Sequence, residues 1–157
     1  MALSKDDIKA SYPLPVYNYR VEIGADSIAF SEVSGLSISY ETFTFKESPT
    51  ESGSAGPRTM TMPSQPQGTT LTLTKGVVRD VSVKALYDWI SSVQLNLVEK
   101  KDIAIRLCDE NGDPVISWRV LNAFPTKLDA PGFDASSNDA AVESMELAAD
   151  AVIIEGA

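Results

Sequence analysis

Carboxylates are the side chains in this sequence with the most obvious capacity for chemistry. Asp109, Glu110, Asn111 and Asp113 surround Gly112 within a single short segment. This group is superficially similar to a calcium-binding loop, but the spacing of a twelve-residue EF-hand loop and its closing glutamate are missing. Nothing nearby indicates an apolar pocket that would shift a carboxylate pKa for acid–base catalysis. We interpret the cluster as an exposed acidic turn and predict no metal site.

Other catalytic side chains are scarce. The 157 residues include no histidine and a single cysteine, Cys108. These absences exclude Ser-His-Asp and Cys-His catalysis, histidine-ligated metal sites and an intrachain disulfide. A carboxylate-based hydrolase would need two carboxylates that converge in a cleft, whereas the acidic clusters lie on turns and near the C-terminus. We predict that the protein is not an enzyme and binds no cofactor.

The net charge is acidic and unevenly distributed. It is −9, from 13 Lys and Arg against 22 Asp and Glu. Such a chain repels nucleic-acid phosphates and anionic membranes, so neither ordinary nucleic-acid binding nor membrane binding by the chain itself is expected. From position 129 onward there is no basic residue, and the acidic residues are Asp129, Asp134, Asp139, Glu143, Glu146, Asp150 and Glu155. A solvated acidic face or tail is one interpretation of this segment.

The length of the chain fits a single domain, which we expect to span residues 1–157. The N-terminus lacks the basic-then-apolar layout of a signal peptide, and no stretch approaches the roughly 20 apolar residues of a membrane span. We therefore expect synthesis in the cytoplasm.

Alternating apolar and polar residues predict β-strands along much of the chain. Strands are expected within residues 16–23, 28–30, 36–46, 69–75, 103–107 and 115–121. The first two would form a hairpin, and the last two would form another around the Asn111-Gly112 turn. Residues 122–140 are expected to be irregular. Residues 141–154 fit a strand or a helix, and periodicity alone does not decide between them.

One helix is predicted over about residues 80–98, with Asp80 or Ser82 as its N-cap. The apolar stripe that predicts it consists of Val83, Leu86, Tyr87, Trp89, Ile90, Val93 and Leu97. The residues expected in the core are Leu86, Trp89 and Ile90, which pack the helix onto the sheet, and Trp118. These elements predict a mainly β fold, an antiparallel β-sandwich or barrel with one packed α-helix.

A long hairpin arm is predicted over about residues 41–68. Residues 47–69 hold four of the nine prolines and three of the nine glycines and cannot belong to the core. A mobile surface loop is one interpretation of this segment. Against it, Phe43 and Phe45 on one side and Met60 and Met62 on the other alternate like paired strands. Apolar side chains on a projecting arm would need a partner.

Several blocks of the sequence, in order over nearly the whole chain, carry a family resemblance. They are Tyr12-Pro-Leu-Pro-Val-Tyr-Asn-Tyr-Arg-Val-Glu-Ile, Phe30-Ser-Glu-Val-Ser-Gly-Leu36, Leu71-Thr-Leu-Thr-Lys-Gly76, Leu86-Tyr-Asp-Trp-Ile90, Asp102-Ile-Ala-Ile-Arg-Leu-Cys-Asp-Glu-Asn-Gly112, Trp118-Arg-Val-Leu-Asn-Ala-Phe-Pro-Thr-Lys127 and the Glu-x-x-Glu-Leu segment from Glu143 to Leu147. Together they resemble the tail-tube proteins of contractile phages and of phage-derived extracellular contractile injection systems.

This resemblance implies a structural subunit. Its copies would form a hexameric ring by joining their sheets into one β-barrel around a lumen, and rings would stack into a tube inside a contractile sheath. The implied partners are further copies of the chain, the sheath protein, baseplate and terminator proteins, and luminal cargo, either a protein effector or DNA. The protein would be part of a virion or of a released extracellular injection particle. The resemblance also implies that the final segment is a strand.

Two surfaces of such a ring can be expected from the residue pattern. The candidates for a ring or stacking interface are Phe43, Phe45, Arg58, Met60 and Met62. In the final strand, with Met145 and Leu147 against the core, Ser144 and Glu146 would face the opposite surface, reinforced by Asp150. That surface would be either the lumen wall or the exterior that faces the sheath. A monomeric β-sandwich binding module is the alternative function.

Overall fold

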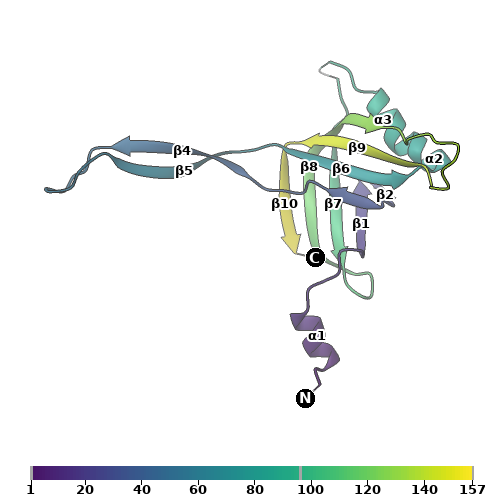
Figure 1. Cartoon of the computed structure of the whole chain (residues 1–157), viewed down its shortest axis with the longest axis horizontal. Helices are drawn as coiled ribbons and strands as arrows, with labels where there is room; N and C mark the ends of the chain where they lie inside the picture. Colours follow the sequence, from purple (N-terminus) through teal and green to yellow (C-terminus); the bar gives the residue numbers. More distant parts are fainter. Residues whose placement is uncertain (1, 96, 157) are drawn as a thin grey trace.

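Two layers of antiparallel strands form the body of the protein (Figure 1), in a computed structural model that describes residues 2–95 and 97–156. Layer A contains β1 (Tyr19–Ile23), β2 (Asp26–Ile28), β7 (Lys101–Cys108), the first part of β8 (Pro114–Asp129) and β10 (Ala151–Gly156). Layer B contains the rest of β8, β9 (Val142–Ala149), β6 (Thr69–Gly76) and β3 (Glu32–Ser34). The predicted mainly β, antiparallel fold is confirmed.

The core lies between the two layers because each strand turns its apolar side chains inward. The alternation in β6 and β9 buries Leu71, Leu73, Met145 and Leu147 almost completely. From layer A the buried residues are Val21, Ile23, Ile28, Ile103, Ile105, Val120 and Val152. Both predicted hairpins are confirmed by the pairing of β1 with β2 and of β7 with β8.

The long strand β8 belongs to both layers because it bends at Asn122. This residue has a φ of 54°, in the left-handed region that asparagine tolerates better than most residues. Its backbone N–H donates a hydrogen bond to Asp102 Oδ1 (3.0 Å), and its side-chain amide donates to Asp150 Oδ2 (3.0 Å). Residues 124–129 then pair with β9. The prediction that residues 122–140 are irregular is therefore wrong for residues 122–129, which belong to β8. The bend at Asn122 and a bulge interrupt the alternation of apolar and polar residues, so the pattern of a strand is lost there.

The C-terminal segment is a strand, as the resemblance implied, but it is interrupted at Asp150. β9 pairs with β6 and with the end of β8. After the corner, where the Asp150 N–H donates to the Leu121 carbonyl (3.0 Å), β10 returns to pair with β8 in layer A. The C-terminal segment thus supplies one strand to each layer.

The predicted helix is present but shorter, and it contains a π-helical turn. Its parts are α2 (Arg79–Ser82), η1 (Val83–Tyr87) and α3 (Asp88–Ser91). The extra residue in a π turn rotates the positions around it, so the stripe does not stay on one face. Val83, in the π turn, was predicted to face the core and is exposed. Val93 and Leu97 are exposed as well, because the helix ends before them, at Ser91. Asn96, inside the predicted helix, lies outside the described residues.

The predicted side-chain cap is also wrong. The N-cap position is Val78, which makes no side-chain cap. Ser82 lies inside the helical segment, where its hydroxyl accepts a hydrogen bond from the Val78 N–H (3.0 Å). No helix of the described residues is long and apolar enough to cross a membrane.

A short N-terminal helix, α1 (Lys5–Ser11), was not predicted. It begins with a capping box, in which the Asp7 N–H donates to Ser4 Oγ (3.1 Å) and the Ser4 N–H donates to Asp7 Oδ2 (3.4 Å). The Ser-x-x-Asp spacing in the sequence was the signal for it. Figure 1 shows α1 separated from the two layers by the extended segment that follows it.

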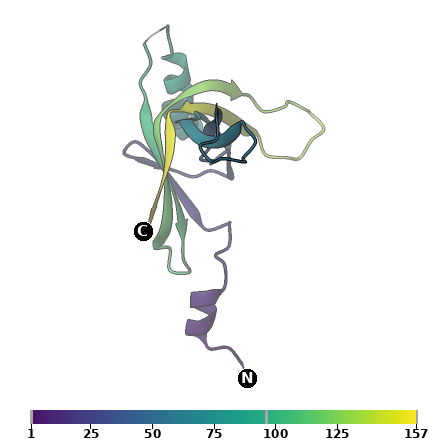
Figure 2. The ribbon, with the colours of Figure 1, turned by 90° about the vertical axis from the view of Figure 1, so that its left-hand side faces the viewer.

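The predicted hairpin arm is confirmed as a two-stranded ribbon outside both layers. It consists of β4 (Tyr40–Glu47) and β5 (Arg58–Pro66), which form a separate two-stranded sheet in the part of the chain that the structure describes. The arm projects far from the body in Figure 1 and is seen from its tip in Figure 2. β5 leads into β6, so the chain passes from the arm directly into layer B.

Candidate assembly surfaces

The arm has one apolar face. Phe43 lies opposite Met62 in the ribbon, and Phe45 lies opposite Met60. Directly opposite residues share a face, and so do residues two apart on one strand, so these four side chains form one contiguous surface. Phe43 and Phe45 remain 48% and 47% exposed. We call this surface the apolar arm face.

The other face of the arm is polar. Thr44 lies opposite Thr61, and Lys46 lies opposite Thr59. Arg58, predicted together with the apolar residues, lies at the end of β5 beside the tip, where its guanidinium is 3.9 Å from the Glu47 carboxylate. The arm is therefore an amphipathic ribbon with a charged tip.

The outer face of layer B is lined by short polar side chains. Thr70, Thr72 and Thr74 of β6 face away from the core, and they lie opposite Ala148, Glu146 and Ser144 of β9. We call the surface formed by Thr70, Thr72, Thr74, Ser144 and Glu146 the hydroxyl face. Ser144 and Glu146 thus share the face that the alternation predicted for them.

Charge on the hydroxyl face is sparse. Lys127 lies opposite Glu146 across β8 and β9, but its ammonium is 3.5 Å from Asp129 Oδ2 instead. Within the described residues the Glu146 carboxylate forms no ion pair. Asp150 does not extend this face, because it lies at the corner after β9 and bonds to Asn122.

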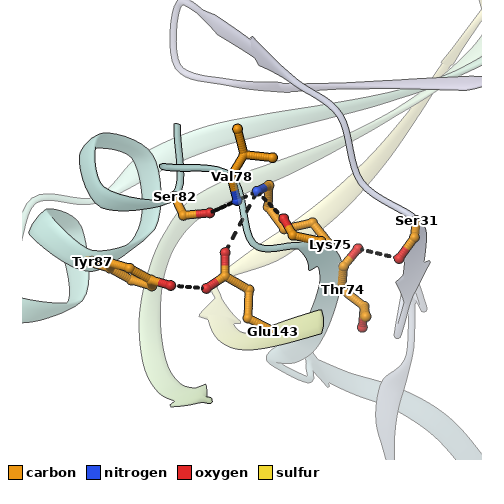
Figure 3. Close-up of polar contacts among 8 residues, drawn as sticks. Ser31, Thr74, Lys75, Val78, Ser82, Tyr87 and Glu143 are labelled. Carbon is orange, nitrogen blue, oxygen red and sulfur yellow. Dashed lines mark hydrogen bonds and ion pairs between the residues drawn. The ribbon is translucent and has the colours of Figure 1, made fainter. Parts of the chain in front are cut away.

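The opposite side of the same strands holds a buried ion pair that was not predicted (Figure 3). Lys75 of β6 and Glu143 of β9 lie directly opposite each other, 3% and 2% exposed, with Lys75 Nζ 3.7 Å from Glu143 Oε1. The sequence carried a signal that both side chains face the core. Lys75 lies two residues after Leu73, and Glu143 lies two residues before Met145, so each shares the inward side of its strand with these apolar residues.

Residues of the helical segment complete this cluster. Ser82 accepts a hydrogen bond from Lys75 Nζ (3.0 Å), and the Tyr87 hydroxyl donates to Glu143 Oε2 (2.5 Å). The hydrogen bond to Glu143 raises the pKa of Tyr87, and burial adds to the effect. The cluster joins the helical segment to β6 and β9 of layer B, so its arrangement is structural. Among the described residues Glu143 Oε1 accepts no hydrogen bond and lies 3.7 Å from the Lys75 ammonium.

The residues predicted for the core lie at the helix and at β8. Leu86 is 1% exposed and Trp89 is 3% exposed, while Ile90 and Trp118 are partly buried against the core. The Trp89 indole N–H donates to the Glu99 carbonyl (2.7 Å), and the Lys101 ammonium lies 5.0 Å from the centre of its ring. Trp89 thus anchors the helical segment to the start of β7.

The acidic residues after position 128 do not form a single acidic face. Glu143 is buried, Glu155 pairs with Arg119 (3.5 Å) in layer A, and Asp129 lies beside Lys127. Asp134 accepts hydrogen bonds from the Ser136 hydroxyl and N–H, which lower its pKa. The interpretation as one solvated acidic face is therefore wrong.

The Asp109 side chain holds the acidic turn by accepting hydrogen bonds from the backbone of the turn. Asp109 Oδ1 accepts hydrogen bonds from the N–H groups of Asn111 (2.9 Å) and Asp113 (3.0 Å), and Glu110 pairs with Lys9 of α1 (3.0 Å). In the described part of the chain, no group of three or more acidic, Cys or His side chains could hold a metal ion.

A comparison with known protein families identifies the family of this chain. Residues 15–153 match the family described as T4-like virus tail tube protein gp19. The chain belongs to this family. It is a structural tail tube protein of the phage-like contractile injection systems and not an enzyme, as the resemblance implied.

Solved structures of contractile injection particles are similar to this chain over nearly its whole length. A chain of the extracellular contractile injection system PVC, in its extended sheath–tube complex, is 43% identical with a TM-score of 0.87, covering 99% of this chain and 100% of that one. A chain of the anti-feeding prophage tube terminating cap is 42% identical, with full coverage of both and a TM-score of 0.84. A chain of the PVC sheath/tube terminator is 45% identical, covering 93% of this chain and 99% of that one, with a TM-score of 0.81. The comparison with curated proteins gave no match.

Proposed function

We propose that copies of this tail tube protein form hexameric rings that stack into a hollow tube, enclosed by a sheath, through which cargo passes. The observation that carries the proposal is the similarity, over 99% of the chain, to a subunit of a PVC sheath–tube complex in the extended state. The terminating cap and the terminator that match at similar identity support contacts with end proteins of such a tube. The alternative, a monomeric binding module, finds no comparable support.

Open strand edges in layer B support ring formation. Within the described residues, residues 124–129 of β8 pair with β9 alone, and β3 covers only part of β6. Unpaired edges of this kind expose backbone donors and acceptors and invite pairing with another chain. Joining the edges of neighbouring copies would close layer B into a continuous barrel without free edges.

The hydroxyl face supports a luminal role for layer B. Short hydroxyl side chains stay hydrated and give a passing molecule few places to hold. Glu146 would repeat around the ring as a belt of negative charge that repels DNA and acidic proteins, which favours passage over adhesion. The outer face of layer B carries one ion pair beside the hydroxyl face, Lys127–Asp129 on β8, whereas the outer face of layer A carries two, Arg106–Glu22 and Arg119–Glu155. We assign that face to the exterior, toward the sheath.

The arm supports contacts between copies. Its apolar face exposes two phenylalanines on a ribbon outside the body, where water contacts them in the isolated chain. Burial of such side chains gives roughly 25 cal/mol per Å² of apolar area, so a neighbouring copy is a favourable place for them. We propose that Phe43, Phe45, Met60 and Met62 contact a neighbouring subunit, with Arg58 near the contact.

The remaining partners follow from the same assembly. The sheath protein would surround the tube, baseplate and terminator proteins would bind its ends, and the cargo would be a protein effector or DNA. The assembled particle would be released from the producing cell or form part of a virion.

Electron microscopy of the purified protein tests the proposal. Negative staining should show rings or tubes of the parent protein, and deletion of residues 48–58 should abolish tube growth. A matched deletion of residues 134–139, another exposed loop, should leave tubes intact. A stable monomer over micromolar to millimolar concentrations, without rings or tubes, would overturn the proposed function.

A further inference from the structure

The register between β6 and β9, the central pair of layer B, is not set by the way the chain connects them. β6 ends at Gly76 and β9 begins at Val142, and the helical segment, β7 and β8 lie between them in the sequence. In a hairpin a short turn fixes which residues lie opposite each other, but no turn joins these two strands. Neither the arm, ahead of β6, nor residues 130–141, ahead of β9, belongs to a layer, so neither holds its strand in one position.

The apolar and hydroxyl side chains of the two strands do not select one register either. A slip by one residue would turn the core side chains outward and is excluded. A slip by two residues keeps every side chain on its own face. On the core side it would only exchange neighbours of similar volume, since these are leucines and a methionine: Leu71, Leu73, Met145 and Leu147. On the outer side, β6 presents a threonine at each position that β9 could face.

Lys75 and Glu143 distinguish the observed register from the slipped ones. They are the two charged side chains among the buried residues that the structure describes, and they lie directly opposite each other, with Lys75 Nζ 3.7 Å from Glu143 Oε1. A two-residue slip would separate them by about 7 Å along the strands. In one direction it would place Glu143 opposite Leu73, and in the other it would place Lys75 opposite Met145. Either slip leaves a buried charge beside an apolar side chain, which is strongly unfavourable.

The helical segment contacts both members of the pair (Figure 3). Ser82 accepts a hydrogen bond from Lys75 Nζ (3.0 Å), and the Tyr87 hydroxyl donates to Glu143 Oε2 (2.5 Å). Ser82 and Tyr87 are five residues apart, so they would lie on different faces of an α-helix. The π turn, with its hydrogen bonds between residues five apart, brings them close together. Because the helical segment follows β6 directly, a slip of β6 against β9 would take Tyr87 away from Glu143.

We propose that the Lys75–Glu143 pair, held by Ser82 and Tyr87, sets the register of layer B. A buried ion pair contributes little net stability compared with well-packed apolar residues, whereas its need for a partner makes every other arrangement unfavourable. Glu143 Oε1 accepts no hydrogen bond among the described residues, so the cluster is not arranged for the greatest stability. Selection of one register explains why two charges lie in the core.

For the tube, this register determines how the two edges of layer B line up. The end of β8 lies at one edge and β3 lies at the other. A two-residue slip would displace β3 and β6 by about 7 Å against β8 and β9, and it would place Glu146 opposite a different threonine. Copies joined edge to edge would then no longer match. This consequence rests on the proposed function, whereas the register itself is a property of the single chain.

Pairs of cysteines on the hydroxyl face can measure the register. Even-numbered residues of β6 direct their backbone groups toward β3, as the hydrogen bond from the Ser31 N–H to the Thr74 carbonyl (2.8 Å) shows, so they form the non-hydrogen-bonded pairs with β9. Cα atoms in such pairs are about 4.5 Å apart, which suits a disulfide, whereas diagonal neighbours are about 7–8 Å apart. Thr72→Cys with Glu146→Cys therefore reports the observed register.

Two further pairs report the slipped registers. They are Thr72→Cys with Ser144→Cys, and Thr72→Cys with Ala148→Cys. Each chain is refolded from urea in reduced form and oxidised at high dilution, and mass spectrometry measures the fraction with a disulfide between the two positions. Cys108 is 3% exposed and is the same in every variant. With Lys75 and Glu143 in place, we expect the pair at the observed register to link about tenfold more than either slipped pair.

The same three cysteine pairs are then compared in the double variant Lys75→Met/Glu143→Leu. It replaces both charges by apolar side chains of similar volume, and we expect it to fold, because such replacements are often neutral or stabilising. Linkage of the slipped pairs relative to the pair at the observed register should rise about tenfold. An unchanged ratio would overturn the proposal. If the double variant does not fold, Glu143→Gln removes the charge and keeps an acceptor for Tyr87; a ratio raised about threefold is expected, and no rise overturns the proposal.

The exchange Lys75→Glu/Glu143→Lys is the matched control. It keeps opposite charges opposite each other, and the hydroxyls of Ser82 and Tyr87 can each donate or accept a hydrogen bond. We expect it to retain the preference for the observed register. Slipped linkage as high as in Lys75→Met/Glu143→Leu would show that the paired charges do not set the register.

Electron microscopy of the same variants tests the consequence for the tube separately. Lys75→Met/Glu143→Leu should form about tenfold fewer tubes than the parent protein, because its layer B no longer has one register. Slipped linkage together with normal tubes would overturn this consequence and leave the register assignment in place. Absence of tubes from the parent protein would overturn the proposed function, and the disulfide measurement on the single chain would still decide the register.

Discussion

Lys75 and Glu143 occupy core positions of layer B although both are ionisable. Each takes the inward side of its strand by parity, and each is almost fully removed from water. Burying a charge costs several kcal/mol unless a partner and further hydrogen bonds compensate it. Ser82 and Tyr87 provide those bonds from the helical segment. The pair therefore depends on the helix being in place, and the helix is held partly by the pair.

Replacing Lys75 by Met should be strongly destabilising. Lys75→Met leaves Glu143 buried without its cation, and loss of one partner of a buried pair costs about 3–5 kcal/mol. Urea unfolding would measure the loss. Arg119→Met removes an exposed pair, with side chains 51% and 44% exposed, and should change the free energy of unfolding by about 0–1 kcal/mol. Equal effects of the two variants would show that the buried pair contributes no more than a surface pair.

Tyr87 makes stability sensitive to alkaline pH. Its pKa is raised above the ordinary value of 10.0, first by the hydrogen bond to Glu143. The folded protein thus keeps this proton to higher pH than the unfolded chain does. The resulting stability is present below about pH 10 and is lost as pH rises through the raised pKa. In Tyr87→Phe, unfolding in urea at about pH 8 and about pH 11 should show a smaller difference than in the parent. Tyr17→Phe, at an 81% exposed position, is the control and should retain the parent's difference.

At the scale of elements, the helical segment and the arm show how local pattern meets tertiary context. The apolar stripe predicted the helix, but the π turn moved Val83 to the surface while Leu86 and Trp89 stayed in the core. In the arm, the alternation of Phe43 and Phe45 predicted pairing that the register confirms. The alternation of apolar residues was reliable for the arm because β4 and β5, which are close in sequence, form the ribbon by pairing with each other. The helix depends also on what it packs against.

Trp89 should carry much of the attachment of the helical segment. Trp89→Ala would leave a large cavity beside Leu86 and remove the hydrogen bond to the Glu99 carbonyl. We expect a loss of about 3–5 kcal/mol in the free energy of unfolding, measured in urea. Val83→Ala, at a 46% exposed position of the same helix, should have a small effect. An unchanged melting temperature in Trp89→Ala would show that the helix is not held by this side chain.

For the whole molecule, the difference between the two outer faces matters most. The hydroxyl face of layer B has Glu146 as its one charged member, and the Lys127–Asp129 pair lies beside it on β8. The outer face of layer A carries two pairs of arginine with glutamate. A tube needs a wall that releases its cargo and an exterior that holds a sheath until contraction. We therefore expect the hydroxyl face to form the wall that releases cargo and the outer face of layer A to hold the sheath.

The variant Glu146→Lys should show whether the hydroxyl face lines the lumen or faces the sheath. At a luminal position, the reversal makes a belt of positive charge that holds acidic cargo, so loading or passage should be impaired while tubes and sheath attachment remain. Glu155→Lys in layer A is the matched control, and its effect should fall on the sheath instead. Cargo content and sheath binding of purified particles would measure both. A sheath defect alone in Glu146→Lys would place the hydroxyl face outside.

Local pattern in the sequence was sufficient for most of the strands, for the arm and for the family resemblance. Each of these depends on residue types at short spacing, as in the alternation of Leu71 and Leu73 or the pairing of Phe43 with Met62. The capping box at Ser4 was also present in the sequence, although it was not used.

Only the tertiary structure decided which layer each strand joins. A single left-handed residue, Asn122, moves β8 from one layer to the other, and its bonds reach Asp102 and Asp150, which are distant in sequence. The burial of Lys75 against Glu143 likewise depends on strands 68 residues apart in the chain meeting in one register. Periodicity tells which side chains share a face of a strand. It contains no information on what covers that face, because the covering residues come from elsewhere in the chain or from another copy.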